Sequence, residues 1–251
     1  MIIFLFSLNW TQDLTAREIM ERNDVQSDSK DTHTEFTMKL INKKGKERVR
    51  SVIQYSITDE NNFDKSIIKF TAPANVKGVG LLTVEEEEKD NQWLYLPATK
   101  RVRRISSNQK SDNFMGSDFT YEDIEKNELD DYKYTLIGEE IIDGVDCYVI
   151  ESYAVSDEIL KETEYGHMKS WISKNHFLQI QVNFYNLKDE LIKIMYSKNI
   201  SQVVNTDKWR AHYIIMENIK SGHRTELIYN ELWIDQGVEE SYFTKRYLEK
   251  G

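Results

Sequence analysis

Apolar and polar residues alternate through most of the chain, which is the pattern of strands whose two faces meet different surroundings. Turn sequences such as Lys43-Lys44-Gly45-Lys46 and Asp143-Gly144 separate these runs, and such turns between alternating runs are typical of β-hairpins. The pattern predicts about a dozen strands. The longer ones are expected at 33–42, 47–58, 64–71, 78–84, 132–139, 147–154, 167–173, 177–185, 190–200, 210–218 and 224–234.

Two helices are expected at the ends of this β-rich region. Residues 13–23 place Leu14, Ile19 and Met20 on one stripe, and Thr15 followed by Glu18 has the spacing of a capping box. A second short helix is predicted at 239–248. Because sequence-adjacent hairpins form an antiparallel meander, and a sheet this long must curl to hide its apolar face, we expect one curved sheet in a mainly β (α+β) fold.

The most distinctive stretch is residues 91–124, where aromatic and basic residues follow one another closely. Trp93 and Tyr95 alternate with leucines in a short strand, and Pro97 ends that strand because it cannot donate to a sheet. Residues 101–105 alternate again and complete a hairpin. The polar run 106–117 is predicted to be a loop, followed by an acidic turn or short helix at 118–124.

The sequence of this stretch resembles that of the outer membrane lipoprotein-sorting proteins, a LolA/LolB-like group of periplasmic carriers. The resemblance lies in WLYLPATKRVRRI at 93–105 and FMGSDFTYEDI at 114–124. The segments QDLTAREIMERND at 12–24, IDGVDCYVIE at 142–151 and the last thirty residues resemble the same family. The resemblance implies an incomplete, half β-barrel of about 11–12 strands, with a helix near each end covering the open side over an apolar cavity. It also implies an exported protein without catalytic activity.

Composition and charge narrow the range of functions. With 251 residues, of which 39% are hydrophobic and 30% charged, the chain is typical of a globular protein with one core. Its net charge of −10 argues against general binding of nucleic acid, because phosphate contacts require a basic face. No repeat or linker divides the chain, so residues 13–251 are expected to form a single domain.

The first twelve residues are interpreted separately. MIIFLFSLNWT resembles the apolar part of a secretory signal, but no basic residue precedes Ile2. Asn9, Trp10 and Thr11 also stand where a cleavage site would have small residues. We interpret residues 1–12 as a truncated or atypical signal segment and expect a periplasmic location.

The sequence gives little support for a catalytic site or a metal site. Cys147 is the only cysteine, so no intramolecular disulfide can form, and its place in an alternating strand predicts a buried thiol. The five histidines lie in separate strands or turns without a metal-ligand spacing, and Gly116-Ser117-Asp118 lacks the second glycine of a nucleophile elbow. We therefore predict no enzyme, no cofactor and no metal.

The leading hypothesis is a carrier that binds acyl chains of lipoproteins or lipids during transfer to the outer membrane. An inner-membrane transporter and an outer-membrane acceptor are its expected partners, and the chain is expected to be a monomer. An apolar chain cannot cross water unshielded, since each buried methylene contributes about 0.8 kcal/mol. The hypothesis assigns five residues to the cavity or its mouth and two to a head group or partner. The cavity or mouth residues are Trp93, Tyr95, Phe114, Met115 and Phe119. The head-group or partner residues are Arg101 and Arg103.

Each assignment has an alternative. The aromatic residues can equally be ordinary core packing, and the basic cluster can be a solvated strand face. A second hypothesis for the whole protein is a non-catalytic envelope interaction module that docks on a membrane transport complex and carries no lipid. A carrier requires a contiguous hollow, whereas a docking module requires an exposed patch over a filled core.

Overall fold

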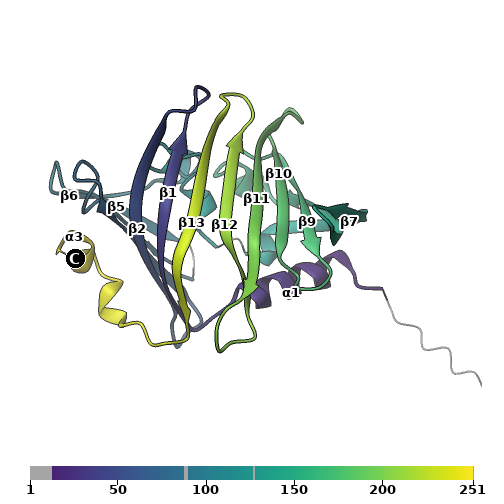
Figure 1. Cartoon of the computed structure of the whole chain (residues 1–251), viewed down its shortest axis with the longest axis horizontal. Coiled ribbons are helices and arrows are strands. Elements are labelled where there is room, and N and C mark those ends of the chain that lie inside the picture. Colours follow the sequence, from purple (N-terminus) through teal and green to yellow (C-terminus); the bar gives the residue numbers. More distant parts are fainter. Residues whose placement is uncertain (1–12, 88–89, 127, 251) are drawn as a thin grey trace, which may run out of the picture.

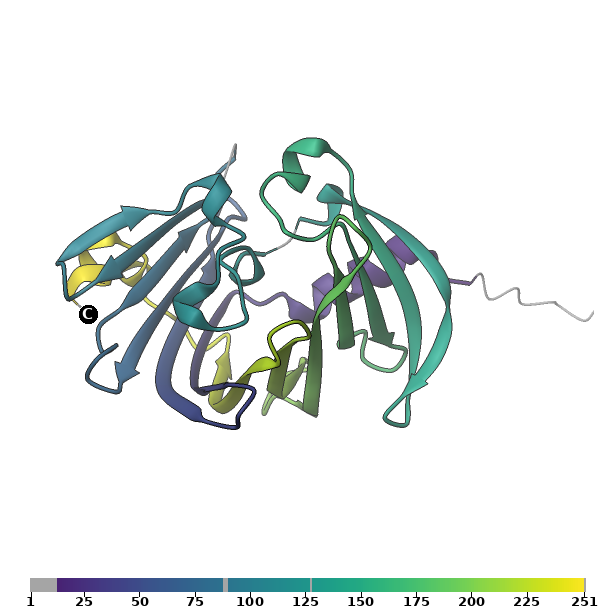
Figure 2. The ribbon, with the colours of Figure 1, turned by 90° about the horizontal axis from the view of Figure 1, so that it is seen from above.

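The computed structural model describes residues 13–87, 90–126 and 128–250, so the predicted signal segment at 1–12 lies outside the described residues. One antiparallel sheet of thirteen strands dominates the fold, and it curves without closing into a barrel (Figure 1, Figure 2). The strands are β1 Asp31–Ile41, β2 Glu47–Thr58, β3 Asp64–Ala72, β4 Gly80–Val84, β5 Asn91–Leu96, β6 Arg101–Arg104, β7 Tyr132–Ile142, β8 Val145–Ala154, β9 His167–Ser173, β10 Gln179–Tyr185, β11 Leu191–Gln202, β12 Trp209–Asn218 and β13 His223–Ile234.

The strand order is β6-β5-β4-β3-β2-β1-β13-β12-β11-β10-β9-β8-β7. Two meanders, β1 to β6 and β7 to β13, are therefore joined only where β1 pairs with β13. The predicted curved, incomplete barrel is confirmed. It contains slightly more strands than the 11–12 expected, because even the four-residue run of β6 pairs with its neighbour.

Three α-helices accompany the sheet: α1 Ala16–Ser27, α2 Asp157–Leu160 and α3 Lys245–Lys250. The capping box of α1 is confirmed, since the Thr15 side chain accepts from the Glu18 backbone N–H and the Glu18 carboxylate accepts from the Thr15 backbone N–H. The short helix α2 was not predicted. Among the helices of the described residues, none has both the length and the apolar character needed to cross a membrane.

The two ends of the chain cover opposite faces of the sheet. On the concave face, α1 packs Ala16, Ile19 and Met20 against Ile150 of β8 and Ile172 of β9. On the convex face, Phe243 and Leu248 from the C-terminal segment pack over β3, β4 and β5. Figure 2 shows α1 inside the curve and the C-terminal segment outside it.

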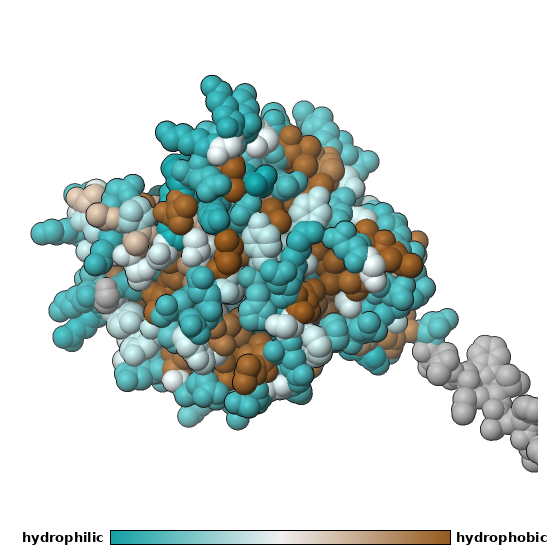
Figure 3. All heavy atoms as spheres, viewed as in Figure 1, coloured by the Kyte–Doolittle hydropathy of each residue, from teal (hydrophilic) through white to brown (hydrophobic). Residues whose placement is uncertain are grey.

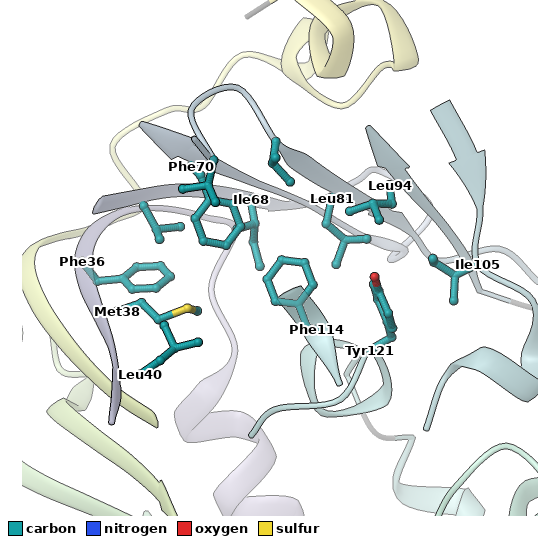
Figure 4. Close-up of a cluster of buried hydrophobic side chains, with 13 residues drawn as sticks. Phe36, Met38, Leu40, Ile68, Phe70, Leu81, Leu94, Ile105, Phe114 and Tyr121 are labelled. Atoms are coloured by element: carbon teal, nitrogen blue, oxygen red, sulfur yellow. The ribbon is translucent and has the colours of Figure 1, made fainter. Parts of the chain in front are cut away.

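The long connection between β6 and β7, which we call the connecting segment (residues 105–131), runs inside the concavity (Figure 2). It contains four short 3-10 helices, at Ser107–Gln109, Phe114–Gly116, Glu122–Ile124 and Leu129–Asp131. Phe114 and Tyr121 of this segment pack into the largest hydrophobic cluster, against side chains of β1 to β5 (Figure 4). This cluster fills one side of the concavity.

On the outer face seen in Figure 3, apolar residues are interspersed with polar ones over the central strands. The alternation within single strands explains this mixture. In β10, for example, the even-numbered residues Ile180, Val182 and Phe184 are buried, and the residues between them are half-buried.

Candidate functional site

The tip of the connecting segment is fixed to the sheet by polar contacts. Asp118 is only 2% exposed. Its Oδ2 accepts a hydrogen bond from the Thr225 hydroxyl at 2.7 Å and lies 2.6 Å from Nδ1 of His223. The Thr225 hydroxyl in turn accepts from the Asp118 backbone N–H. Next to this contact, Arg50 of β2 donates to the carbonyl of Met115 at 2.9 Å. These contacts join the segment to both meanders of the sheet.

A second set of contacts holds the segment at Asp123. Its carboxylate accepts hydrogen bonds from the Tyr165 hydroxyl at 3.0 and 3.1 Å, and Lys193 Nζ lies 4.0 Å away. Lys193 is 2% exposed and also donates to Tyr165. Burial raises the pKa of Asp123, and the nearby Lys193 and hydrogen bonds oppose that rise. The segment is thus anchored by paired buried charges as well as by apolar packing.

A first chamber lies under the connecting segment, beside the C-terminal end of α1. Its volume is about 280 Å³, and most of the residues that line it are polar or charged. Thr32, Ser56, Ser66 and Thr83 project into it from β1 to β4, and Ile124 of the connecting segment closes it from above. Acidic residues lie at its rim, and burial raises the pKa of one of them, Asp90.

A second chamber, also of about 280 Å³, lies over β11, β12 and β13. It shares four lining residues with the first, so the two chambers are neighbours, and we call the pair the central cavity. The shared residues are Ser27, Thr32, Gln54 and Arg210. Apolar side chains line the second chamber to a greater extent, namely Leu178, Met195, Ala211, Ile214, Tyr229 and Leu232.

A separate hollow of about 510 Å³ opens between the connecting segment and α2, and we call it the acidic hollow. Among the described residues, ten carboxylates and two lysines line it. Lys110 pairs there with Glu125 at 2.7 Å and with Glu162 at 3.0 Å. Burial, reinforced by neighbouring carboxylates, raises the pKa of Glu122 to about 8. Nevertheless, no cluster of histidine, cysteine and acidic side chains in residues 13–87, 90–126 and 128–250 is arranged to hold a metal ion.

Three of the predicted site residues lie on the connecting segment. Phe114 is 1% exposed within the largest hydrophobic cluster, where its ring meets Tyr121 edge-on at 5.6 Å. Met115 packs at the edge of the same cluster, and Phe119 is buried in a different one, beside Tyr165 and Val182. None of the three lines either chamber; they pack the connecting segment onto the sheet, and the residues of that segment that line the first chamber are Ile124 and Lys126.

The other predicted site residues lie further away. Trp93 and Tyr95 point to the convex face, where the C-terminal segment covers them and Lys245 Nζ lies 4.2 Å from the Trp93 ring centroid. Arg101 and Arg103 are exposed on β6, the short strand at one edge of the sheet. The structure therefore places Phe114 and Met115 in one cluster and Phe119 in another, all on the connecting segment, and separates them from the remaining four.

Cys147 lies where the strand pattern placed it. It is fully buried in β8, and its thiol donates to the carbonyl of Val145. Burial raises the pKa of this thiol to about 11. Since a thiolate is the reactive form, this cysteine has a structural role only.

The residues that line the central cavity were not singled out from the sequence. Thr34, Gln54, Met195 and Tyr229 belong to ordinary alternating strands, and nothing in their local sequence differs from that of residues on the outer face. One available clue was the run of small polar residues at equivalent positions in successive strands, Thr32, Ser56 and Ser66.

The fold and sequence are similar to those of several solved proteins. A candidate outer membrane lipoprotein-sorting protein domain from Vibrio parahaemolyticus is 33% identical and superimposes with a TM-score of 0.86, with 94% of this chain and 98% of that chain covered. A DUF1329 family protein from Desulfovibrio piger is 31% identical, also with a TM-score of 0.86, over 93% of this chain and 97% of that one. A LolA superfamily protein from Nitrosomonas europaea shares the fold at 23% identity and a TM-score of 0.73, over 94% and 100% of the two chains.

A family model described as "uncharacterized protein" matches residues 62–250, which is most of the chain. No curated protein matches the sequence.

Proposed function

Because the chain belongs to the family of outer membrane lipoprotein-sorting proteins, we propose that it is a non-catalytic carrier in the periplasm that holds the acyl part of a lipid or lipoprotein. The central cavity is the observation that carries this proposal. It lies on the concave face of an unclosed sheet, and its second chamber is lined by Leu178, Met195, Ile214, Tyr229 and Leu232. Each chamber is near the lower limit of known ligand pockets, which are about 300–1,000 Å³.

Binding energy for such cargo comes from covering methylene groups. Each buried methylene contributes about 0.8 kcal/mol, so ten of them contribute about 8 kcal/mol before the cost of ordering the chain. A long acyl chain needs more room than one chamber offers. The connecting segment is therefore proposed to shift when cargo binds, and Phe114, Met115 and Phe119 are proposed to contact the chain once it has shifted.

The remaining predicted site residues have separate proposed roles. Arg101 and Arg103 are exposed at the sheet edge and are proposed to contact an acidic partner or an anionic head group. Trp93 and Tyr95 can reach cargo only if the C-terminal segment leaves the convex face, so they are proposed to support that segment instead.

The carrier proposal is tested by blocking the cavity. The Ala211→Phe substitution adds a ring to the wall of the second chamber, whereas Ala98→Phe adds the same ring to an exposed turn. The proteins are delipidated and titrated with a fluorescent long-chain fatty acid. We expect saturable binding with about one ligand per chain for the wild type and for A98F, and at least tenfold weaker binding for A211F. Equal binding by all three proteins, or none by the wild type, would refute the proposal.

The acidic hollow supports a second candidate function, an interaction module that docks on a positively charged segment of a membrane transport complex. Its ten carboxylates against two lysines favour a basic partner. This candidate predicts salt-sensitive binding of a lysine-rich peptide and no binding of fatty acid. The titration of the wild type with fatty acid therefore distinguishes the two.

A further inference from the structure

The floor of the first chamber carries a continuous row of polar side chains. Register places Thr32 opposite Ser56, Ser56 opposite Ser66, and Ser66 opposite Thr83. Thr83 lies opposite Gln92 on β5, so the row crosses five strands. Directly opposed residues in an antiparallel sheet share a face, with Cβ atoms about 4.5–5.5 Å apart. We call these five residues the polar row.

Beside this row the concave face is polar on β1 and β2, at Thr34 and Gln54, and apolar on β3 to β5. In the next rows of the same face, Ile68, Leu81 and Leu94 follow one another, as do Phe36, Val52 and Phe70. These apolar residues pack under the connecting segment, whereas four members of the polar row, all except Gln92, line the first chamber. The polarity is thus confined to the part of the face that lines the hollow.

Two side chains near the row hold buried polar atoms without a partner among the described residues. Thr34 is 7% exposed and lines the second chamber beside the row, and its hydroxyl oxygen makes no hydrogen bond. Gln92 is 2% exposed and donates to the carbonyl of Tyr121, but its own side-chain oxygen accepts nothing. Buried polar atoms in proteins nearly always have a hydrogen-bond partner, which is protein or water. Of these two atoms, only the Thr34 hydroxyl belongs to a residue that lines a chamber, where a bound molecule can supply the partner.

The charges around the first chamber disfavour an anionic ligand. Its lining includes five carboxylates, from Asp24, Asp28, Asp64, Glu85 and Asp90. It also includes three basic side chains, and each of them already has partners. Lys65 pairs with Asp59 and Glu240, Lys126 pairs with Asp64, and Arg210 donates to the carbonyls of Gln26 and Ser27.

From these observations we infer that the polar row, together with Thr34 beside it, binds the uncharged, hydroxyl-rich head group of an amphiphile whose chain lies in the second chamber. Hydroxyl groups can both donate to and accept from the Thr, Ser and Gln side chains of the row, and they can donate to the surrounding carboxylates. A phosphate would meet those carboxylates at close range with no uncommitted cation. This inference rests on the proposed carrier function and adds the class of head group to it.

The test compares three ligands with the same ten-carbon chain, each below its critical micelle concentration. They are decyl glucoside, decyl phosphate and decyltrimethylammonium, titrated calorimetrically into the full, delipidated chain at low salt. We expect decyl glucoside to bind at least tenfold more tightly than either charged ligand. If decyl phosphate or decyltrimethylammonium binds as tightly as the glucoside, the inference is overturned while the carrier function stands. If none of the three binds, the carrier function itself fails.

A matched pair of variants locates the head group. Thr34→Val removes a hydroxyl that has no partner in the protein, so folding is expected to be unchanged. The loss of one hydrogen bond to the ligand is expected to weaken glucoside binding about three- to tenfold. Thr135→Val makes the same change on exposed β7 and is expected to leave binding unchanged. Equal glucoside affinity in T34V and T135V would place the head group elsewhere and overturn the inference.

Discussion

Glu122 lies on the connecting segment at the acidic hollow, and it should make the stability of the protein depend on pH. One of its carboxylate oxygens is buried and has no hydrogen-bond partner among the described residues. The nearby Lys110 is bonded to Glu125 and Glu162 instead. Burial therefore dominates and raises the pKa of Glu122 from 4.5 to about 8 in the folded protein.

The sign of the effect follows from proton binding. Between about pH 4.5 and pH 8 the folded protein retains a proton on Glu122 that the unfolded chain releases, so the free energy of unfolding falls as pH rises through this range. At about 1.4 kcal/mol per pKa unit, the largest possible loss is about 5 kcal/mol. Water entry and local relaxation reduce this, and we expect a loss of about 2–3 kcal/mol.

The Glu122→Gln variant removes the ionisation and retains the shape of the side chain. Urea unfolding followed by tryptophan fluorescence, at pH values from 5 to 9, should give similar stabilities for wild type and E122Q at pH 5. At pH 9 the variant should be more stable by about 2–3 kcal/mol. Glu60→Gln, in an exposed turn, serves as the control and should follow the wild type. Parallel stability curves for E122Q and the wild type would refute the reasoning.

Three further substitutions test how the connecting segment is held. Asp118→Ala removes the carboxylate that contacts His223 and Thr225 on β13. It should lower the free energy of unfolding by about 2–3 kcal/mol, and faster proteolysis within residues 105–131 is a second readout. Lys193→Met removes the cation that pairs with Glu164 at 2.5 Å and lies 4.0 Å from the buried carboxylate of Asp123. It should cost about 3–5 kcal/mol at pH 7, but less at pH 5, where the Asp123 carboxylate gains a proton more readily. Phe114→Ala should cost about 3–5 kcal/mol in urea unfolding, since its ring is fully enclosed, and a cost below 1 kcal/mol would show that the segment is not packed on the sheet.

Much of the fold follows from local sequence. Alternation located the strands to within a few residues, and Thr15 with Glu18 marked the start of α1 correctly. The pairing of β1 with β13 is different, because those strands lie almost two hundred residues apart in the chain and no local pattern specifies the partner. That pairing decides the curvature, and with it the position of the central cavity.

The faces of the sheet could not be assigned from alternation alone. In β2 to β4 the apolar residues Ile57, Ile67 and Leu82 lie on the convex face, and Ser56, Ser66 and Thr83 lie on the concave face. This reverses the usual rule that the apolar face is the inner one. The reversal occurs because the C-terminal segment covers the convex face with Phe243 and Leu248, which supplies a second core outside the curve.

The same arrangement explains why Trp93 and Tyr95 were assigned to the cavity. Strand β5 carries large apolar residues on both faces, so its sequence is compatible with either orientation. Leu94 faces the connecting segment, and the two aromatic rings face the C-terminal segment. Only the aromatic residues at 242–247 could have indicated that the rings of Trp93 and Tyr95 pack against the C-terminal segment.

The position of the cavity follows from which part of the concave face is covered. The five central strands, β2, β1, β13, β12 and β11, have ten to twelve residues each, whereas β4, β5 and β6 have four to six. The connecting segment and α1 cover the flanks of the concave face, and the central strands extend beyond both covers. Under the proposed carrier function, the cavity enlarges by movement of the connecting segment, which is held by the apolar packing of Phe114 and by the Asp118 and Asp123 contacts. We therefore expect substitutions that weaken these contacts to make ligand entry faster.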